Sequence, residues 1–190
     1  MNDHFSVHGG RITIGFDIRK FACRHKLSMT SYDESCRYED LIEDHPEEIS
    51  ALNLFKRDPS TIQGLIIPKH ALIIAFDAAA QTVAHMKKGN VSVPPSIASG
   101  NLTLPWVLAG FDLVDLYTQL SAFDLIGDCA EFPDDELLAK LLEKNQYGLI
   151  ANFFLAQKIA RRLDDVFFEH KPFTSVGVWL KEISNGNAGT

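Results

Sequence analysis

Three aspartates offer the clearest route to metal-assisted chemistry in this sequence of 190 residues. Asp77 is followed by Gln81 at the spacing i, i+4. In the next long apolar stretch, Asp112, Asp115 and Gln119 stand at i, i+3 and i+7. On two facing helices each set would form one polar stripe, and the aspartates would converge inside a bundle. Asp77, Asp112 and Asp115 are therefore a candidate site for Mg²⁺ or Mn²⁺.

The competing interpretation is that each stripe is the single solvent-facing edge of its helix. Helical carboxylate metal sites are typically marked by Glu-x-x-Glu or Glu-x-x-His spacings, and these two stretches contain neither. We therefore expect no metal ligands and no resident cofactor, and keep Mg²⁺ or Mn²⁺ as the alternative.

The remaining residues with chemical potential show no recognisable catalytic or metal-binding pattern. His4, His8, Cys23 and His25 are zinc-type ligands, but their spacing matches no closed four-ligand site. The sequence has no Gly-x-Ser-x-Gly motif, no phosphate-binding P-loop and no Gly-x-Gly-x-x-Gly. We therefore predict no catalytic residues.

The densest charge in the sequence lies between residues 28 and 48. Its candidate partner-binding residues are Asp33, Glu34, Glu39, Asp40, Glu43 and Asp44, which we call the acidic strip. Such a strip complements a basic protein surface and gives fast, salt-sensitive association. The net charge of −7 argues against direct binding to nucleic acid or to an anionic membrane. The alternative is a solvated loop that only keeps the chain soluble.

The cysteines and the apolar stretches indicate the cellular compartment of the protein. Cys23, Cys36 and Cys129 are odd in number and form no Cys-x-x-Cys pair, which is typical of a compartment that keeps thiols reduced. The first residues contain no apolar core of a signal peptide. Aspartates inside the longest apolar stretch would be costly in a bilayer. We therefore expect a cytoplasmic protein.

The apolar stretch 104–127 is predicted to be a helix buried on nearly every side, around which the other helices pack. Those other helices are expected near residues 46–57, 58–88, 133–144, 147–170 and 172–185. Only residues 11–19 alternate as a half-buried strand does. A lone strand needs a partner, so we expect a small hairpin or a homodimer formed through this strand.

The tripeptide [Ala/Gly]-Phe-Asp occurs four times, at residues 15–17, 75–77, 110–112 and 122–124. The spacings are irregular, and the expected secondary structure differs between copies. We therefore interpret these copies as chance rather than as an internal repeat.

Together these patterns predict a mainly α protein with a single domain over residues 1–190. It would comprise an N-terminal β element (1–27), an acidic loop (28–45), a bundle of about six helices (46–185) and a flexible tail (186–190). The predicted function is that of a non-enzymatic interaction protein of inhibitor, immunity or adaptor type, which binds a basic protein through the acidic strip. The alternative is an α-helical, divalent-metal-dependent enzyme that acts on a phosphorylated or nucleotide-like substrate.

Overall fold

The computed structural model describes residues 10–28, 71–88, 106–118, 120–124 and 135–182. Its framework is an antiparallel sheet of four strands in the order β1-β2-β4-β3. The strands are β1 (Arg11–Lys20), β2 (Ala71–Ala79), β3 (Val107–Asp115) and β4 (Phe173–Glu182). Strands β2 and β4 are therefore the inner pair, and β1 and β3 lie outside them.

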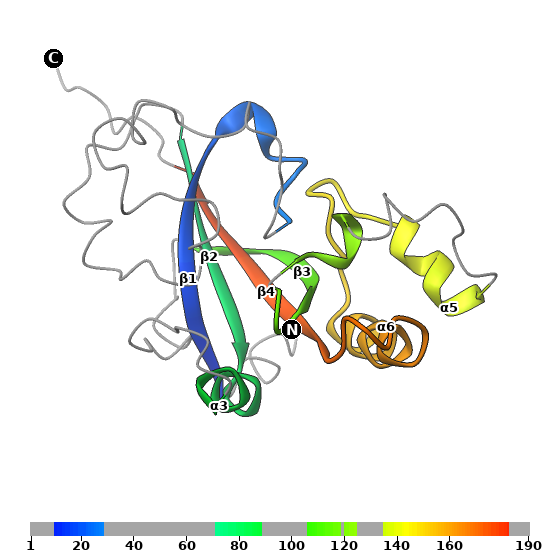
Figure 1. Ribbon diagram of the computed structural model, residues 1–190. Coiled ribbons are helices and arrows are strands. Elements are labelled where there is room, and N and C mark those ends of the chain that lie inside the picture. Colours follow the sequence, from blue (N-terminus) through cyan, green and yellow to red (C-terminus); the bar gives the residue numbers. More distant parts are fainter. Residues whose placement is uncertain (1–9, 29–70, 89–105, 119, 125–134, 183–190) are drawn as a thin grey trace, which may run out of the picture.

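Helical segments lie at both ends and on one face of this sheet. The described ones are the 3-10 turn η2 (Phe21–Cys23), α3 (Ala80–Lys88), α5 (Glu136–Ala139), the 3-10 turn η6 (Lys140–Leu142) and α6 (Phe153–Val166). Helix α3 continues directly from β2 at the lower end of β1 and β2, whereas α5 and α6 lie beyond β3 and β4 (Figure 1). Helix α6 packs against β4 and β3.

The predicted all-α, six-helix bundle is wrong, because the described chain is built on the sheet. The stretch 104–127, expected as the central helix, contains strand β3, and the expected helix 172–185 contains strand β4. The expected helix over 58–88 is strand β2 as far as Ala79 and helical only from Ala80 onward. Strand β2 is buried on both faces, so apolar residues follow one another without the alternation that marks a half-buried strand. The expected helix 46–57 lies outside the described residues.

Three predicted elements are found in the described chain, and both helices are shorter than expected. Strand β1 covers the alternating segment, but its partner is β2 rather than a neighbouring hairpin strand, so the N-terminal element belongs to the main sheet. Helix α5 with η6 lies within 133–144, and α6 lies within 147–170. Helix α6 buries Ala156, Ala160 and Leu163, which lie on one face at the spacing of an amphipathic helix.

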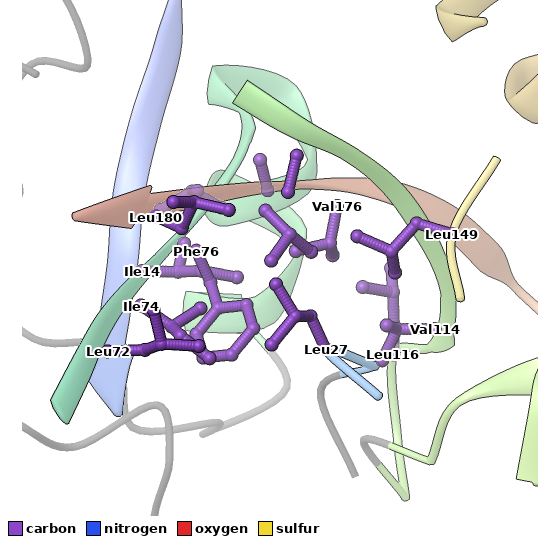
Figure 2. Packing of buried hydrophobic residues seen from close by; sticks show 14 residues of the cluster. Ile14, Leu27, Leu72, Ile74, Phe76, Val114, Leu116, Leu149, Val176 and Leu180 are labelled. Carbon is purple, nitrogen blue, oxygen red and sulfur yellow. The ribbon is translucent and has the colours of Figure 1, made fainter. Parts of the chain in front are cut away.

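The two faces of the sheet bury separate apolar clusters. On one face, Phe76 of β2 points toward Leu27, while Val114 and Leu149 close the far side (Figure 2). The opposite face is covered by α6, which packs its buried residues against β3 and the start of β4. Both sides of the sheet are thus removed from water, which explains why the inner strands carry so few polar residues.

The edge strands β1 and β3 share a local structure. Each has an irregular register immediately before a glycine, Gly15 in β1 and Gly110 in β3. Each glycine begins a Gly-Phe-Asp sequence whose aspartate accepts the N–H of the next residue, at 2.8 Å for both Asp17 and Asp112. Since β1 lies beside β2 and β3 beside β4, these segments occupy equivalent places about an approximate two-fold axis between β2 and β4. Two of the four copies of the tripeptide, which the sequence patterns indicated to be chance, therefore stand at equivalent places in the sheet.

Asp135 joins the two helices that cover the sheet. Its carboxylate caps α5 by accepting the N–H groups of Leu137 and Leu138, at 2.9 and 3.0 Å. It also accepts a 2.6 Å hydrogen bond from Nε of Arg162 on α6. The N–H of Leu138, followed by the hydrogen bond from Arg162, holds the pKa of Asp135 below its ordinary value.

This lowered pKa predicts a specific dependence of stability on acid. Ionised Asp135 contributes stability that is fully present above the unfolded-chain pKa and is lost as the pH falls through the lower folded-state pKa. In Asp135→Asn that contribution is missing at every pH. We therefore expect the urea midpoint of the variant to fall less than that of the wild type between about pH 7 and about pH 3. Equal falls for the two proteins would contradict the assigned role of Asp135.

Candidate functional site

A buried ion pair lies on the sheet face that α6 covers. Nε of Arg11 donates to Oδ1 of Asp77 at 2.7 Å, and both side chains are almost completely buried. Nη2 of Arg11 also donates to the main-chain oxygens of Asp77 and Ser175, at 2.8 and 3.1 Å. The other carboxylate oxygen of Asp77 accepts Nε1 of Trp179 at 3.0 Å. Each oxygen of this carboxylate therefore has a strong donor, as a buried charge requires.

Aromatic rings enclose the guanidinium of Arg11. Its Cζ lies 5.8 Å from the ring centroid of Phe111 on β3 and 5.4 Å from that of Phe153 on α6. These two rings pack on each other with their centroids 5.3 Å apart. One side chain from β1 thus contacts the three other strands and α6. The arrangement is typical of a charge that organises a core, since cation–π contacts gain strength when they are desolvated.

Asp112 lies on the other face of the sheet. Asp77 and Phe111 both pair with Gly177 and so share a face, whereas Asp112 follows Phe111 and points the opposite way. Oδ1 of Asp112 accepts the hydroxyl of Ser121 at 2.6 Å, and Val114 forms an isolated bridge with Ser121. Asp112 therefore fastens the segment that follows β3 to the strand itself.

The carboxylate of Asp115, the last residue of β3, contacts the imidazole of His170. Its Oδ1 accepts the N–H of Tyr117, and its Oδ2 accepts the hydroxyl of Thr118, each at 2.7 Å. Nδ1 of His170 lies 3.3 Å from Oδ2, and 36% of the His170 side chain is exposed. A carboxylate that orients a histidine is an arrangement in which the histidine can act as a general base.

A nucleophilic site of this type also needs a hydroxyl or thiol within hydrogen-bond reach of the histidine. The hydroxyl of Thr118 already donates to Asp115. Within the described residues, no hydroxyl or thiol is hydrogen-bonded to His170. The N–H of Leu116 donates to the main-chain oxygen of Pro172 at 3.1 Å across the same junction. The Asp115–His170 contact therefore ties the turn after β3 to the loop before β4.

The structure buries all three predicted metal-binding aspartates but does not bring them together. Asp77 pairs with Arg11, Asp112 with Ser121, and Asp115 with Thr118 and His170. Within the described residues, no group of three or more His, Cys, Asp and Glu side chains is placed to hold a metal ion. The expected convergence depended on two facing helices, and these segments are strands instead.

The acidic strip lies outside the described residues, as do His4 and His8. This places the predicted partner-binding residues Asp33, Glu34, Glu39, Asp40, Glu43 and Asp44 beyond structural description, although the ends of their segment are fixed. Lys20 and Ala71, which flank residues 21–70, are direct partners in the sheet. Cys23 is disulfide-bonded, so the expectation of free thiols is wrong at this residue.

Sequence reasoning missed the partners rather than the acids. The sequence patterns assign neither Arg11 nor Trp179 nor His170 to a candidate site. One available signal was the arginine itself, because an arginine inside an apolar strand needs a buried acceptor. Arg19, on the same strand, shows the same behaviour by donating to Asp17 and to the main-chain oxygen of Lys26.

Comparison with known protein families, with curated proteins and with solved structures finds no match to this chain. Among the helices that the structure describes, none is long and apolar enough to cross a membrane.

Removing the carboxylate of Asp77 should destabilise the protein strongly. Asp77→Ala leaves Arg11 charged and without its main acceptor in the core, and we expect a loss of about 3–5 kcal/mol in the free energy of unfolding. The matched control is Asp165→Ala, which removes an exposed carboxylate 3.5 Å from Arg162 and should cost less than about 1 kcal/mol. Urea unfolding of the two variants measures both losses, and similar values would contradict the role given to Asp77.

Gly177 should be intolerant of a side chain for a related reason. A Cβ at this residue would overlap the carboxylate of Asp77 and lie 3.5 Å from Nη2 of Arg11. We expect Gly177→Ala to lower the free energy of unfolding by about 3 kcal/mol, because the ion pair must move in a packed core. Gly10→Ala serves as the comparison: its Cβ meets nothing within 4 Å, and only its φ of +83° costs about 1 kcal/mol. A smaller loss for Gly177→Ala than for Gly10→Ala, measured by urea unfolding, would contradict the packing described here.

Proposed function

We propose that this protein is a non-enzymatic interaction protein, of inhibitor, immunity or adaptor type, and that its acidic strip binds a protein with a basic surface. The observation that carries the proposal is the pairing of Lys20 with Ala71. Strand β1 ends and strand β2 begins at this pair, which fixes both ends of the connection 21–70 at one point of the sheet. A long connection fixed at both ends to a buried sheet is the usual location of a binding segment.

The distribution of charge supports the same proposal. Residues 29–70 contain nine of the 25 acidic residues but only four of the 18 lysines and arginines. This segment therefore carries most of the net charge of −7, and the rest of the chain is close to neutral. A negative field concentrated on one connection favours rapid encounter with a basic partner.

The buried polar groups of the sheet provide further support. The carboxylates of Asp77, Asp112 and Asp115 are each engaged by protein donors, in networks that stabilise the fold. The metal-dependent enzyme required these three groups to converge on one ion, so we do not carry it forward as a second candidate. The homodimer through β1 stays a prediction on which the proposal does not depend.

The cytoplasm stays part of the proposal on the sequence argument alone. The disulfide bond of Cys23 is the observation against it, because cytosolic thiols are normally kept reduced. Binding through the acidic strip requires neither a reducing nor an oxidising compartment.

Neutralising the acidic strip tests the proposed function. The variant carries Glu39→Gln, Asp40→Asn, Glu43→Gln and Asp44→Asn. The control carries the same change in charge on exposed described residues: Glu136→Gln, Glu143→Gln, Asp165→Asn and Glu169→Gln. The partner is first captured from the native cell and identified by mass spectrometry, and its Kd is then measured by calorimetry at several salt concentrations.

The two variants should differ in affinity and in salt dependence. We expect the strip variant to bind at least about ten-fold more weakly and to lose most of its salt dependence, because the complementary charge is gone. The control should stay within about two-fold of the wild type, since exposed charges away from an interface add little. Unchanged affinity of the strip variant, or an equal loss in the control, would rule out the acidic strip as the binding surface.

A further inference from the structure

Helix α6 presents an exposed aromatic residue opposite its buried seam. The side chain of Phe154 is 63% exposed, while Ala156, Ile159 and Leu163 of the same helix are buried against the sheet. Single exposed apolar side chains are ordinary on protein surfaces, so exposure alone does not distinguish Phe154. Its rigid support and the charges beside it do.

Phe154 is held rigidly by its neighbours. Its ring packs edge-on against Phe153, with the centroids 5.6 Å apart. Phe153 packs in turn on Phe111, and the guanidinium of Arg11 lies over both of these rings. The exposed ring thus ends a continuous aromatic chain that begins at the buried Arg11–Asp77 ion pair. A pre-ordered ring loses little conformational freedom on binding, which is the property of an interface anchor.

Two cations lie on the same side of the helix as Phe154. Lys158 and Arg161 follow it at i+4 and i+7, and both are exposed. Neither forms an ion pair with any residue in the described ranges, whereas the neighbouring Arg162 contacts both Asp135 and Asp165. The three residues span about 10 Å along the helix axis.

We propose that Phe154, Lys158 and Arg161 form a docking surface for an acidic segment of another protein. The segment would place an apolar side chain on the ring of Phe154 and carboxylates against the two cations, with Arg161 able to bind one carboxylate through two nitrogens. The two positive charges of this surface favour an acidic protein segment as its partner. Two cations on a chain of net charge −7 are too few for a phosphate backbone or an anionic bilayer, which are bound by larger basic patches.

This surface is built from other residues than the acidic strip and is opposite in charge. Helix α6 contacts Arg11 at the beginning of β1, whereas the acidic segment leaves the sheet after Lys20 at the end of the same strand. The inference therefore does not rest on the proposed function, and each can fail without the other.

Photo-crosslinking of the full chain in its native cell tests the docking surface. A photoreactive benzoyl-phenylalanine replaces Phe154, and a matched control carries it at Phe168, which is 67% exposed on the loop after α6. We expect adducts from position 154 in at least about five-fold excess over position 168, because anchors at an interface are held against the partner. Mass spectrometry should map them to a protein segment in which Asp and Glu outnumber Lys and Arg.

Charge reversal separates specific docking from accidental contact. Lys158→Glu with Arg161→Glu should abolish the adducts from position 154, while Lys144→Glu with Lys171→Glu, an equal change at two other exposed lysines, should leave them. Thermal melting confirms that both double variants are folded. The proposal is overturned by adducts only to lipid, to nucleic acid, to a second copy of this chain or to a basic segment. An absence of adducts at position 154, or equal effects of the two charge reversals, also overturns it.

Discussion

The buried ion pair of Arg11 and Asp77 is the interaction on which the register of the sheet depends. A slip of one residue in β2 would move Asp77 to the opposite face, into the apolar cluster around Phe76, and leave Arg11 unpaired. The cost of such an unpaired buried charge is several kcal/mol, which is a large part of the stability of a domain of this size. The residues of β4 follow from the same constraint: Gly177 leaves space for the carboxylate, and Trp179 supplies its second donor.

The edges of the sheet show how β3 can be an outer strand without an open hydrogen-bonding edge. Phe111 exchanges both main-chain hydrogen bonds with Ile150, at 2.8 and 3.0 Å, and the N–H of Asp115 donates to Leu120 at 2.9 Å. Between them, the N–H of Leu113 is satisfied by the side chain of Asp112. The Gly-Phe-Asp sequence thus has a physical role at an edge, because its aspartate covers a main-chain donor that would otherwise recruit another strand. Asp17 does the same on β1, which explains why the motif recurs at both edges.

Burial explains which elements the sequence predicts correctly and which it does not. Helix α6 and strand β1 have periodic patterns, and both were predicted. Strands β2 and β3 are buried on both faces, and a continuous apolar run fits a buried helix as well as a buried strand. Gly110 within the apolar run 104–127 was an available warning, since glycine inside a helix costs about 1 kcal/mol. For the candidate site, the sequence supplied the aspartates but not their partners. Arg11 and Trp179 lie 66 and 102 residues from Asp77 along the chain, and no local pattern encodes such pairings.

The positions of the long connections determine where function can lie on this framework. Segment 21–70 departs and returns at the pair Lys20–Ala71, and the connection 116–172, which contains α6, departs and returns at the pair Asp115–Phe173. Because the strands are antiparallel, these two pairs lie at opposite ends of the sheet, separated by the length of a strand, about 30 Å. The two connections therefore begin and end farther apart than the distance over which salt-screened charges interact. Strand β1 links the two ends, because its first residue contacts α6 and its last residue precedes the connection 21–70. The connection that carries the acidic strip and the helix that carries the proposed docking surface are thus anchored at opposite ends of one sheet.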